Sequence, residues 1–363
     1  MNLKDHNILF FPRTMGLGGT ENVVLQLCEI MKPLVNSIVV CSCGGNNVRI
    51  LCEMGIKHYE IPDIERKSIK SIISISKQLQ YIIKKERITI IHTHHRMAAF
   101  YVVLLGLNKR FLFLNTCHNT FTNKRVLTRV AYRNTKLIAC GEMVKKNLIE
   151  YFGLPEKQIT VIHNAVKPFN GSVSIDPYIE QFHKEGCFVV ANIGRLSEQK
   201  GMKYYIQAIP EVVEEHPETR FLIIGSGKDE MELKDLVKKL EVEDVVYFMG
   251  YRSDVQNLMS QVDLIVLSSL WEGLPLTPIE AFSVHKAVVA TAVDGTVEIV
   301  ENEKTGMLIS SRSAPQIAEK IIWSIEHPQE IKIMEESAYH LFNEKFSFEV
   351  MKHKYINYYK SLE

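Results

Sequence analysis

The sequence of 363 residues lacks an apolar run long enough to cross a bilayer. Its longest apolar runs, such as 98–107, fall well short of the roughly 20 residues that a membrane-spanning helix needs. Its start also lacks the succession of basic, apolar and small residues that is typical of a secretory signal peptide. We therefore expect a cytoplasmic protein.

Cysteines are few and form no recognisable framework. There are seven, an odd number, and most lie in or beside apolar runs, which favours reduced core residues over disulfides. Cys41 and Cys43 could be proposed as a metal pair, but no second pair completes a zinc site.

Charge is nearly balanced overall, yet it is divided unequally along the chain. Residues 1–170 contain 24 Lys and Arg against 11 Asp and Glu, a formal charge of +13, whereas residues 171–363 carry −12. A basic half suits a phosphate-rich partner, which could be an anionic membrane, a lipid pyrophosphate or nucleic acid. Nucleic acid is disfavoured, because the positive charges lack interleaved exposed aromatics and a helix-turn-helix pattern.

Short apolar or β-branched runs alternate with helical patterns in both halves of the chain, which predicts an α/β protein with two parallel, doubly wound sheets. The expected strands are 7–11, 37–41, 88–93, 111–117, 136–140 and 159–163 in the first half, and 187–193, 220–225, 245–248, 264–267 and 287–291 in the second. Residues 164–184, with two prolines and a glycine, interrupt the alternation. We expect an N-terminal domain over 1–165, a linker over 166–184, a C-terminal domain over 185–344, and a final helix within 345–363 that returns to the first domain.

The most informative segment is 268–282, SSLWEGLPLTPIEAF, which follows an expected strand. Glu272 lies in a Gly/Pro loop, and Thr277 to Glu280 resemble a helix capping box. Glu280 can therefore be a helix cap and Glu272 a solvated loop acid. The alternative is that both carboxylates hold sugar and ribose hydroxyls, beside backbone N–H groups of the loop between them. The residues that offer these N–H groups are Gly273, Leu274 and Leu276.

A second segment, 191–201, places Gly194, Arg195 and Lys200 directly after another expected strand. Two fixed cations at a strand end can neutralise a departing diphosphate without a metal ion. Alone, these residues could equally be an unrelated surface Arg and Lys.

Together the two segments resemble the signature of the retaining glycosyltransferase family 4. This resemblance implies the GT-B fold, in which two Rossmann-like domains face a cleft. It further implies that Arg195 and Lys200 hold the donor diphosphate, that Glu272 contacts the donor sugar, and that Glu280 contacts the ribose. A covalent role for Glu272 is a minor alternative.

Further segments occur in the order that the family shows. Gly225 and Gly227 resemble its glycine loop against the nucleotide, and Tyr251 with Arg252 resembles the segment whose backbone receives the base. His118 matches the N-domain histidine that reaches the donor sugar. A flexible glycine loop beside the donor and acceptor phosphates corresponds to Gly16, Gly18 and Gly19. The chain departs from the family at 164–167, at 285–287 and at Asp294-Gly295, so the resemblance implies the reaction class but neither the hinge geometry nor the identity of the sugar.

No Asp-x-Asp is present, which favours metal-independent transfer and no cofactor. His92, His94 and His95 suggest a metal site, since His92 and His94 share a strand face, but no carboxylate cluster accompanies them.

The resemblance implies a retaining glycosyltransferase that moves a hexose or N-acetylhexosamine from a nucleotide-sugar, expected to be a UDP-sugar, to a lipid-linked or saccharide acceptor in cell-surface polysaccharide or glycoconjugate biosynthesis. A nucleotide-sugar epimerase of the same fold is the alternative. A nicotinamide oxidoreductase is disfavoured, because Glu21 stands where the dinucleotide fingerprint has its third glycine.

The basic half predicts peripheral binding to the inner, anionic face of the membrane. Lys70, Lys77 and Lys84 recur on one face of a predicted helix. Another predicted helix, 125–136, should turn its arginines outward and its apolar side chains inward. The side chains expected to face inward are Val126, Leu127, Val130 and Ala131.

Overall fold

The computed structural model describes residues 2–66 and 68–362, so Met1 and Glu363, the outer ends of two expected ranges, lie outside the description. The chain divides into two compact units. Unit 1 comprises Met1–Asn164 with Met351–Glu363, and unit 2 comprises Ala165–Val350. Among the described residues, no helix has the length and apolar content needed to cross a bilayer.

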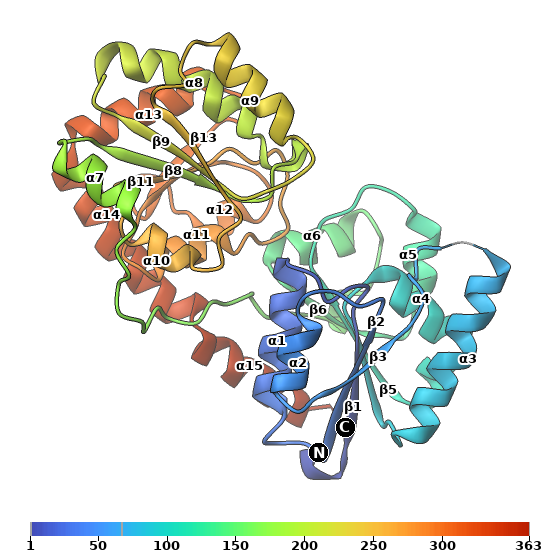
Figure 1. Cartoon of the computed structure of the whole chain (residues 1–363). Coiled ribbons are helices and arrows are strands. Elements are labelled where there is room, and N and C mark those ends of the chain that lie inside the picture. Colours follow the sequence, from blue (N-terminus) through green and yellow to red (C-terminus); the bar gives the residue numbers. More distant parts are fainter. Residues whose placement is uncertain (1, 67, 363) are drawn as a thin grey trace. The chain divides into compact units, whose positions relative to one another are not determined.

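Unit 1 is built on a seven-stranded parallel sheet with the order β3-β2-β1-β4-β5-β6-β7. Figure 1 shows α1, α2 and α15 on one side of this sheet and α3, α4 and α5 on the other. The strands are β1 (Asn7–Phe11), β2 (Ser37–Ser42), β3 (Lys57–Glu60), β4 (Ile90–Thr93), β5 (Leu112–Cys117), β6 (Lys136–Ala139) and β7 (Ile159–Val161). The helices are α1 (Gly19–Met31), α2 (Val48–Glu53), α3 (Ile69–Lys85), α4 (Arg96–Leu104), α5 (Arg125–Ala131), α6 (Glu142–Glu150) and α15 (Phe348–Lys360).

Unit 2 contains a six-stranded parallel sheet with the order β10-β9-β8-β11-β12-β13. Its strands are β8 (Val189–Ile193), β9 (Arg220–Ile224), β10 (Val246–Gly250), β11 (Leu264–Leu267), β12 (Val288–Thr291) and β13 (Gly306–Ile309). Its helices are α7 (Pro177–Lys184), α8 (Met202–Glu215), α9 (Glu230–Lys239), α10 (Val255–Met259), α11 (Thr277–Phe282), α12 (Thr296–Ile299), α13 (Ala314–Glu326) and α14 (Pro328–Leu341). Both units thus have the doubly wound α/β architecture that the alternation predicted.

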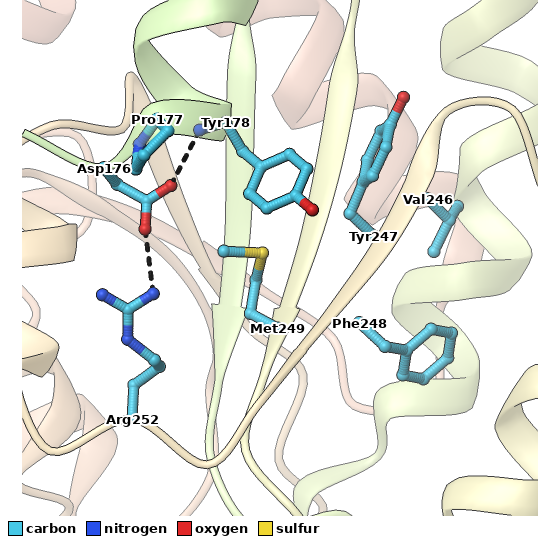
Figure 2. Close-up of a pocket in the computed structure, with 8 residues that line it drawn as sticks. All are labelled: Asp176, Pro177, Tyr178, Val246, Tyr247, Phe248, Met249 and Arg252. Atoms are coloured by element: carbon cyan, nitrogen blue, oxygen red, sulfur yellow. Dashed lines mark hydrogen bonds and ion pairs between the residues drawn. The ribbon is translucent and has the colours of Figure 1, made fainter.

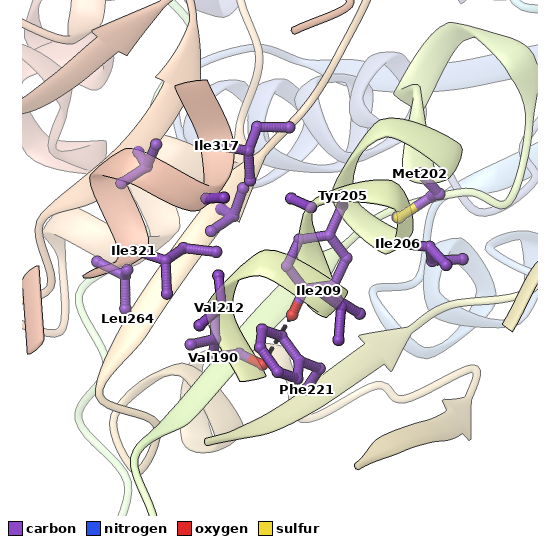
Figure 3. Close-up of a cluster of buried hydrophobic side chains, with 14 of the residues drawn as sticks. Val190, Met202, Tyr205, Ile206, Ile209, Val212, Phe221, Leu264, Ile317 and Ile321 are labelled. Carbon is purple, nitrogen blue, oxygen red and sulfur yellow. Dashed lines mark hydrogen bonds between the residues drawn. The ribbon is translucent and has the colours of Figure 1, made fainter. Parts of the chain in front are cut away.

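Buried apolar side chains hold the helices of unit 2 on its sheet. Strands β8, β11 and β12 are buried along their whole length, as expected for parallel strands covered on both faces. Figure 3 shows Tyr205 and Ile209 of α8 together with Ile317 and Ile321 of α13 over the sheet. The hydroxyl of Tyr205 donates to the carbonyl of Val190 at 3.0 Å, so the buried polar atom is satisfied.

The segment expected to be a linker, 166–184, belongs to unit 2, and its second part forms α7. Asp176 caps this helix by accepting hydrogen bonds from the backbone N–H groups of Tyr178 and Ile179. Ile179 and Phe182 are buried, so α7 packs as part of the unit. The two prolines and the glycine therefore do not mark a flexible connection over the whole segment.

The C-terminal helix α15 begins in unit 2, and its residues from Met351 onward belong to unit 1. Tyr355 and Tyr359 are fully buried there. The hydroxyl of Tyr359 lies 2.6 Å from Nδ1 of His92 on β4, which ties the end of the chain to the centre of the first sheet.

The helix that contains Arg125 ends earlier than expected, and its apolar residues do not all face inward. Helix α5 buries Thr128 and Ala131, whereas Val126 and Val130 are 77% and 43% exposed. The prediction that both valines face the core is therefore wrong. In a helix of only two turns, the packing of Thr128 and Ala131 sets the buried side, which leaves the valines among exposed arginines.

Candidate functional site

The loops at the carboxyl ends of the central strands of unit 2 contain most of the expected site residues. After β8, Gly194 and Arg195 begin a loop that ends in the short helical turn Glu198–Lys200. Arg195 is exposed, and its guanidinium has no ion pair among the described residues. Gly201 follows with φ +59°, and a side chain there would clash with the carbonyl of Ser268. The loop after β8 is thereby packed directly against the loop after β11.

Lys200 and Glu272 form a buried ion pair across these two loops. The Nζ atom of Lys200 lies 2.6 Å from Oε1 of Glu272, and their side chains are 18% and 8% exposed. The hydroxyl of Ser269 donates to the same carboxylate oxygen at 2.7 Å. The backbone N–H of Glu272 donates to Asp294, which fixes the loop from its other side. Glu272 is therefore not the solvated loop acid of the simpler interpretation.

Glycines allow the loops after four strands to approach backbone to backbone. Gly225 has φ +144°, and a Cβ atom there would lie 1.9 Å from the carbonyl oxygen of Gly194. A Cβ at Gly227 would lie 2.1 Å from the carbonyl oxygen of Leu196. The amide of Leu196 donates to the carbonyl of Ser226 at 3.0 Å, so this contact is also hydrogen-bonded. Likewise, Gly295 leaves only 1.8 Å between a built Cβ and the carbonyl oxygen of Gly273.

Glu280 does not cap helix α11. The helix begins at Thr277 with Leu276 as its N-cap, and no side chain makes a capping hydrogen bond, so the predicted capping box is wrong. Among the described residues, no hydrogen bond or ion pair engages the carboxylate of Glu280. Burial raises the pKa of Glu280 to about 7, an effect that the nearby positive charge of Lys200 opposes. The carboxylate is thus available to a ligand.

The backbone of the 273–276 segment is held within unit 2. Gly273 and Leu274 are buried, and Leu276 is partly buried at the start of α11. Their backbone N–H groups come shortly after Glu272 in the chain, as expected if they bind the same ligand as its carboxylate.

Tyr251 and Arg252 follow the edge strand β10 but differ in their surroundings. Tyr251 is 54% exposed. The guanidinium of Arg252 pairs with Asp254 at 2.7 Å and with Asp176 at 2.8 Å, so this side chain ties β10 to the start of α7. Figure 2 shows Arg252 at one side of a cavity of about 600 Å³ that Tyr178 and residues of β10 also line. Because the guanidinium of Arg252 is already paired, a nucleotide base could contact this segment only through its backbone or through Tyr251.

In unit 1 the expected glycine loop follows β1 and leads into α1. Gly18 is the N-cap of α1 and Gly19 its first residue. The side-chain amide of Asn47 donates to the carbonyl of Gly16 at 2.7 Å, which anchors the loop to the segment after β2.

His118 lies at the end of β5 beside His94, which lies at the end of β4. Nε2 of His118 is 3.1 Å from Nδ1 of His94, and the two rings stack with centroids 5.4 Å apart. Burial lowers the pKa of His118 to about 4, and it also lowers the pKa of His94 well below its ordinary value. Both imidazoles are therefore neutral at pH 7. No pattern in the sequence had joined His94 to His118.

In the 92–95 segment, both ring nitrogens of His92 lie against hydroxyl groups. Nδ1 of His92 meets the hydroxyl of Tyr359, and its Nε2 lies 2.7 Å from the hydroxyl of Thr116. Within 2–66 and 68–362, no group of three His, Cys, Asp or Glu side chains is arranged to hold a metal ion.

Two family models match the chain, one in each half. Residues 17–168 match the model described as Glycosyltransferase Family 4, and residues 177–341 match the model described as Glycosyl transferases group 1. Between them they include every expected site residue except Gly16.

Two curated relatives are enzymes whose names include a lipid-linked acceptor or a lipid. The chain is 27% identical over 321 residues to the UDP-Gal:alpha-D-GlcNAc-diphosphoundecaprenol alpha-1,3-galactosyltransferase of Escherichia coli, covering 81% of each chain. It is also 27% identical to one component of the phosphatidylinositol N-acetylglucosaminyltransferase of Homo sapiens, covering 82% of this chain and 64% of that one. These relatives are transferases, so they give no support to the epimerase alternative.

Solved structures share the fold over nearly the whole chain. A glycosyltransferase from Rickettsia africae superimposes with a TM-score of 0.85 at 24% identity, covering 99% of this chain and 98% of that one. The Anabaena protein HepE, in complex with UDP and glucose, gives a TM-score of 0.85 at 19% identity, covering 98% and 100%. The fold is therefore GT-B.

Proposed function

This chain belongs to the glycosyltransferases that the Family 4 and group 1 models describe, and we propose that it moves a hexose or N-acetylhexosamine from a UDP-sugar to a lipid-linked acceptor with retention. The proposed donor site is the set of loops after β8, β9, β11 and β12 in unit 2. The nucleotide of the donor is suggested by the names of the Escherichia coli relative and of the Anabaena complex.

The main observation behind this proposal is the buried pair of Lys200 and Glu272. Keeping a lysine and a carboxylate largely away from water is costly, which favours a role for the pair in binding a charged ligand. A UDP-sugar presents both matching groups, because its diphosphate needs a cation and its sugar hydroxyls need an acceptor. Glu280, whose carboxylate has no partner among the described residues, is suited to the ribose hydroxyls.

In the proposed reaction, the bond between the anomeric carbon and the β-phosphate oxygen breaks while the acceptor oxygen bonds to the same face of that carbon. The acceptor proton passes to the departing phosphate oxygen, so no separate base is required. Arg195 and Lys200 stabilise the negative charge that develops on the diphosphate. Such preorganised charge is commonly the largest contribution to catalysis.

The donor is tested first, by thermal shift and calorimetric titration with UDP, UDP-glucose, UDP-galactose and UDP-N-acetylglucosamine, and with the corresponding GDP and ADP compounds. A ligand at 100 times its Kd should stabilise the native state by about 2.7 kcal/mol. Stabilisation by UDP compounds alone is the expected result, and stabilisation by none of these nucleotides would refute the donor site.

Transfer is tested with N-acetylglucosamine linked through diphosphate to a polyprenol, and with phosphatidylinositol as the alternative acceptor. Acceptor-dependent release of UDP is expected, and NMR of the product gives its anomeric configuration. The proposed metal independence predicts the same rate in EDTA as in magnesium, because protein cations take the place of the metal. Loss of activity in EDTA with recovery in manganese or magnesium would contradict it.

We further propose that unit 1 binds an anionic membrane face through exposed residues of α3 and α5. On α3, Lys70, Lys77 and Lys84 are exposed along one side, and Ile73 and Tyr81 fall between them at helical spacing with exposures of 50% and 57%. Basic side chains interleaved with apolar ones are typical of interfacial helices. Each Lys or Arg near such a surface contributes about 1 kcal/mol.

The contribution of α5 and of Arg133 just beyond its end is tested by reversing three exposed arginines to glutamate, a variant called the α5 reversal below. The substituted residues are Arg125, Arg129 and Arg133. Sedimentation with vesicles of phosphatidylglycerol, with phosphatidylcholine vesicles as the control, measures the loss of binding.

A further inference from the structure

His94 and His118 of unit 1 form a buried contact between two neutral imidazole rings. A contact of His118 with the donor sugar would not by itself require His94. His94 is 4% exposed, and its Nδ1 is in hydrogen-bond range of Nε2 of His118. Its ring stacks on that of His92, with centroids 4.4 Å apart, and lies 5.8 Å from that of Phe10. The plane of the His94 ring is therefore fixed from two sides before it meets His118.

Each ring of the His94–His118 pair has one nitrogen in the contact and one nitrogen without a partner among the described residues. One nitrogen of each ring is used in the contact between them. The other two, Nδ1 of His118 and Nε2 of His94, are buried and have no hydrogen-bond partner in the described part of the chain. A neutral imidazole has one donor and one acceptor nitrogen, so the proton shared in the contact fixes the tautomer of both rings.

Two arrangements are possible, and they differ in where the unpaired N–H lies. If His94 donates, the unpaired N–H is Nδ1 of His118; if His118 donates, it is Nε2 of His94. Unpaired buried N–H groups are rarer than unpaired acceptors. His94 is the more deeply buried residue, so the first arrangement places the N–H on the side chain that is better able to meet a ligand.

We propose that His94 is a positioning residue for His118. Nδ1–H of His94 donates to Nε2 of His118, which leaves Nδ1–H of His118 as the single ring donor for a hydroxyl oxygen of the donor sugar. This inference rests on the proposed function together with the sugar contact that the family resemblance implies for His118. Loss of His94 should weaken binding of the sugar part of the donor and leave binding of UDP itself unchanged.

The experiment compares His94→Phe with His94→Asn. Phenylalanine fills the space but cannot hydrogen-bond, whereas the amide of asparagine occupies the place of Nδ1 and can still donate to His118. His92→Phe is the matched control, because it removes an equally buried imidazole whose partners are Tyr359 and Thr116. Calorimetry measures the affinities for UDP and for UDP-glucose, UDP-galactose and UDP-N-acetylglucosamine, and denaturant unfolding measures the stability of each variant.

We expect His94→Phe to weaken binding of the preferred UDP-sugar by about fivefold to tenfold, as for one lost hydrogen bond, with the affinity for UDP unchanged. His94→Asn should retain most of the affinity, and His92→Phe should change stability only. In a His118→Ala background, His94→Phe should have no further effect on sugar binding. Long-range ¹H–¹⁵N spectra of histidine-labelled protein should show Nε2 of His118 unprotonated in the wild type and a mixture of tautomers in His94→Phe.

The outcomes separate this inference from the proposed function. If His118→Ala weakens UDP-sugar binding but His94→Phe does not, the positioning role is refuted and the proposed site stands. Equal losses in His94→Phe and His94→Asn, or a loss of UDP affinity in either, would show a structural role and also refute it. If His118→Ala binds the UDP-sugar as tightly as the wild type, the sugar contact itself is wrong.

Discussion

The pairing of Lys200 with Glu272 makes the effects of substituting them interdependent. Glu272→Gln and Lys200→Ala should each lower transfer by at least about a hundredfold, on the scale of one lost preorganised charge contact. If the two residues acted independently, the double variant would lose about ten-thousandfold. Because the side chains are 2.6 Å apart, we expect the double variant to lose only about a hundredfold to a thousandfold, since the first substitution already disrupts the contact of the second.

The same geometry predicts unequal effects on stability. Removing one partner of a fully buried pair costs about 3–5 kcal/mol. Lys200→Ala leaves the carboxylate of Glu272 buried with only the hydroxyl of Ser269 against it. We expect a loss of about 2–3 kcal/mol, at or just below the lower end of that range, because Lys200 retains some exposure. Glu272→Gln should cost less, about 1 kcal/mol, because the amide oxygen can still accept from the lysine.

Urea unfolding gives the stability of each variant, and UDP release in the presence of acceptor gives its activity. Lys203→Ala, an exposed lysine on the following helix, is the matched control and should change stability by less than about 0.5 kcal/mol. Near-normal turnover in either correctly folded single variant would refute the site assignment. Additive losses in the double variant would refute the functional coupling of the pair.

Three further predictions concern the loops, the pH dependence and the membrane. Gly225→Ala should destabilise unit 2 and abolish UDP binding. The control Gly186→Ala, at φ +76° with no atom near its Cβ position, should lower the free energy of unfolding by only about 1–2 kcal/mol. Equal unfolding midpoints of the two variants would disprove the close approach of Gly225 to Gly194. The Kd for the preferred UDP-sugar, measured by calorimetry, should fall as pH rises from 6 to 8, because Glu280, with a pKa of about 7, must lose its proton to accept ribose hydroxyls as a carboxylate. Glu280→Gln should show no such slope, since the diphosphate of a UDP-sugar, unlike that of free UDP, has no proton to lose in this range. Wild-type protein should sediment with phosphatidylglycerol vesicles at low salt and the α5 reversal should not, with UDP-sugar hydrolysis unchanged in both; equal sedimentation of the two proteins would exclude α5 as the membrane contact.

The sequence alone determined the architecture. Parallel strands that are covered on both faces must be apolar along their whole length, so their runs are visible without a structure. The strands that the sequence missed, Lys57–Glu60 and Gly306–Ile309, lie at the edges of their sheets, and the first has no apolar run. The sequence also predicted that Lys200 and Glu272 lie in the loops that follow β8 and β11, and that Glu280 lies at the start of the next helix.

Only the tertiary structure decided which of these residues meet. Lys200 and Glu272 are 72 positions apart, and their contact depends on how closely two loops approach, which glycines such as Gly201 allow. Only the structure shows that Arg252 forms ion pairs with Asp176 and Asp254. It also shows that Glu280 makes no capping hydrogen bond at the start of α11. Sequence patterns report the period of burial along one segment, whereas the partner of a polar side chain is set by segments distant in the chain that the fold brings within about 3 Å.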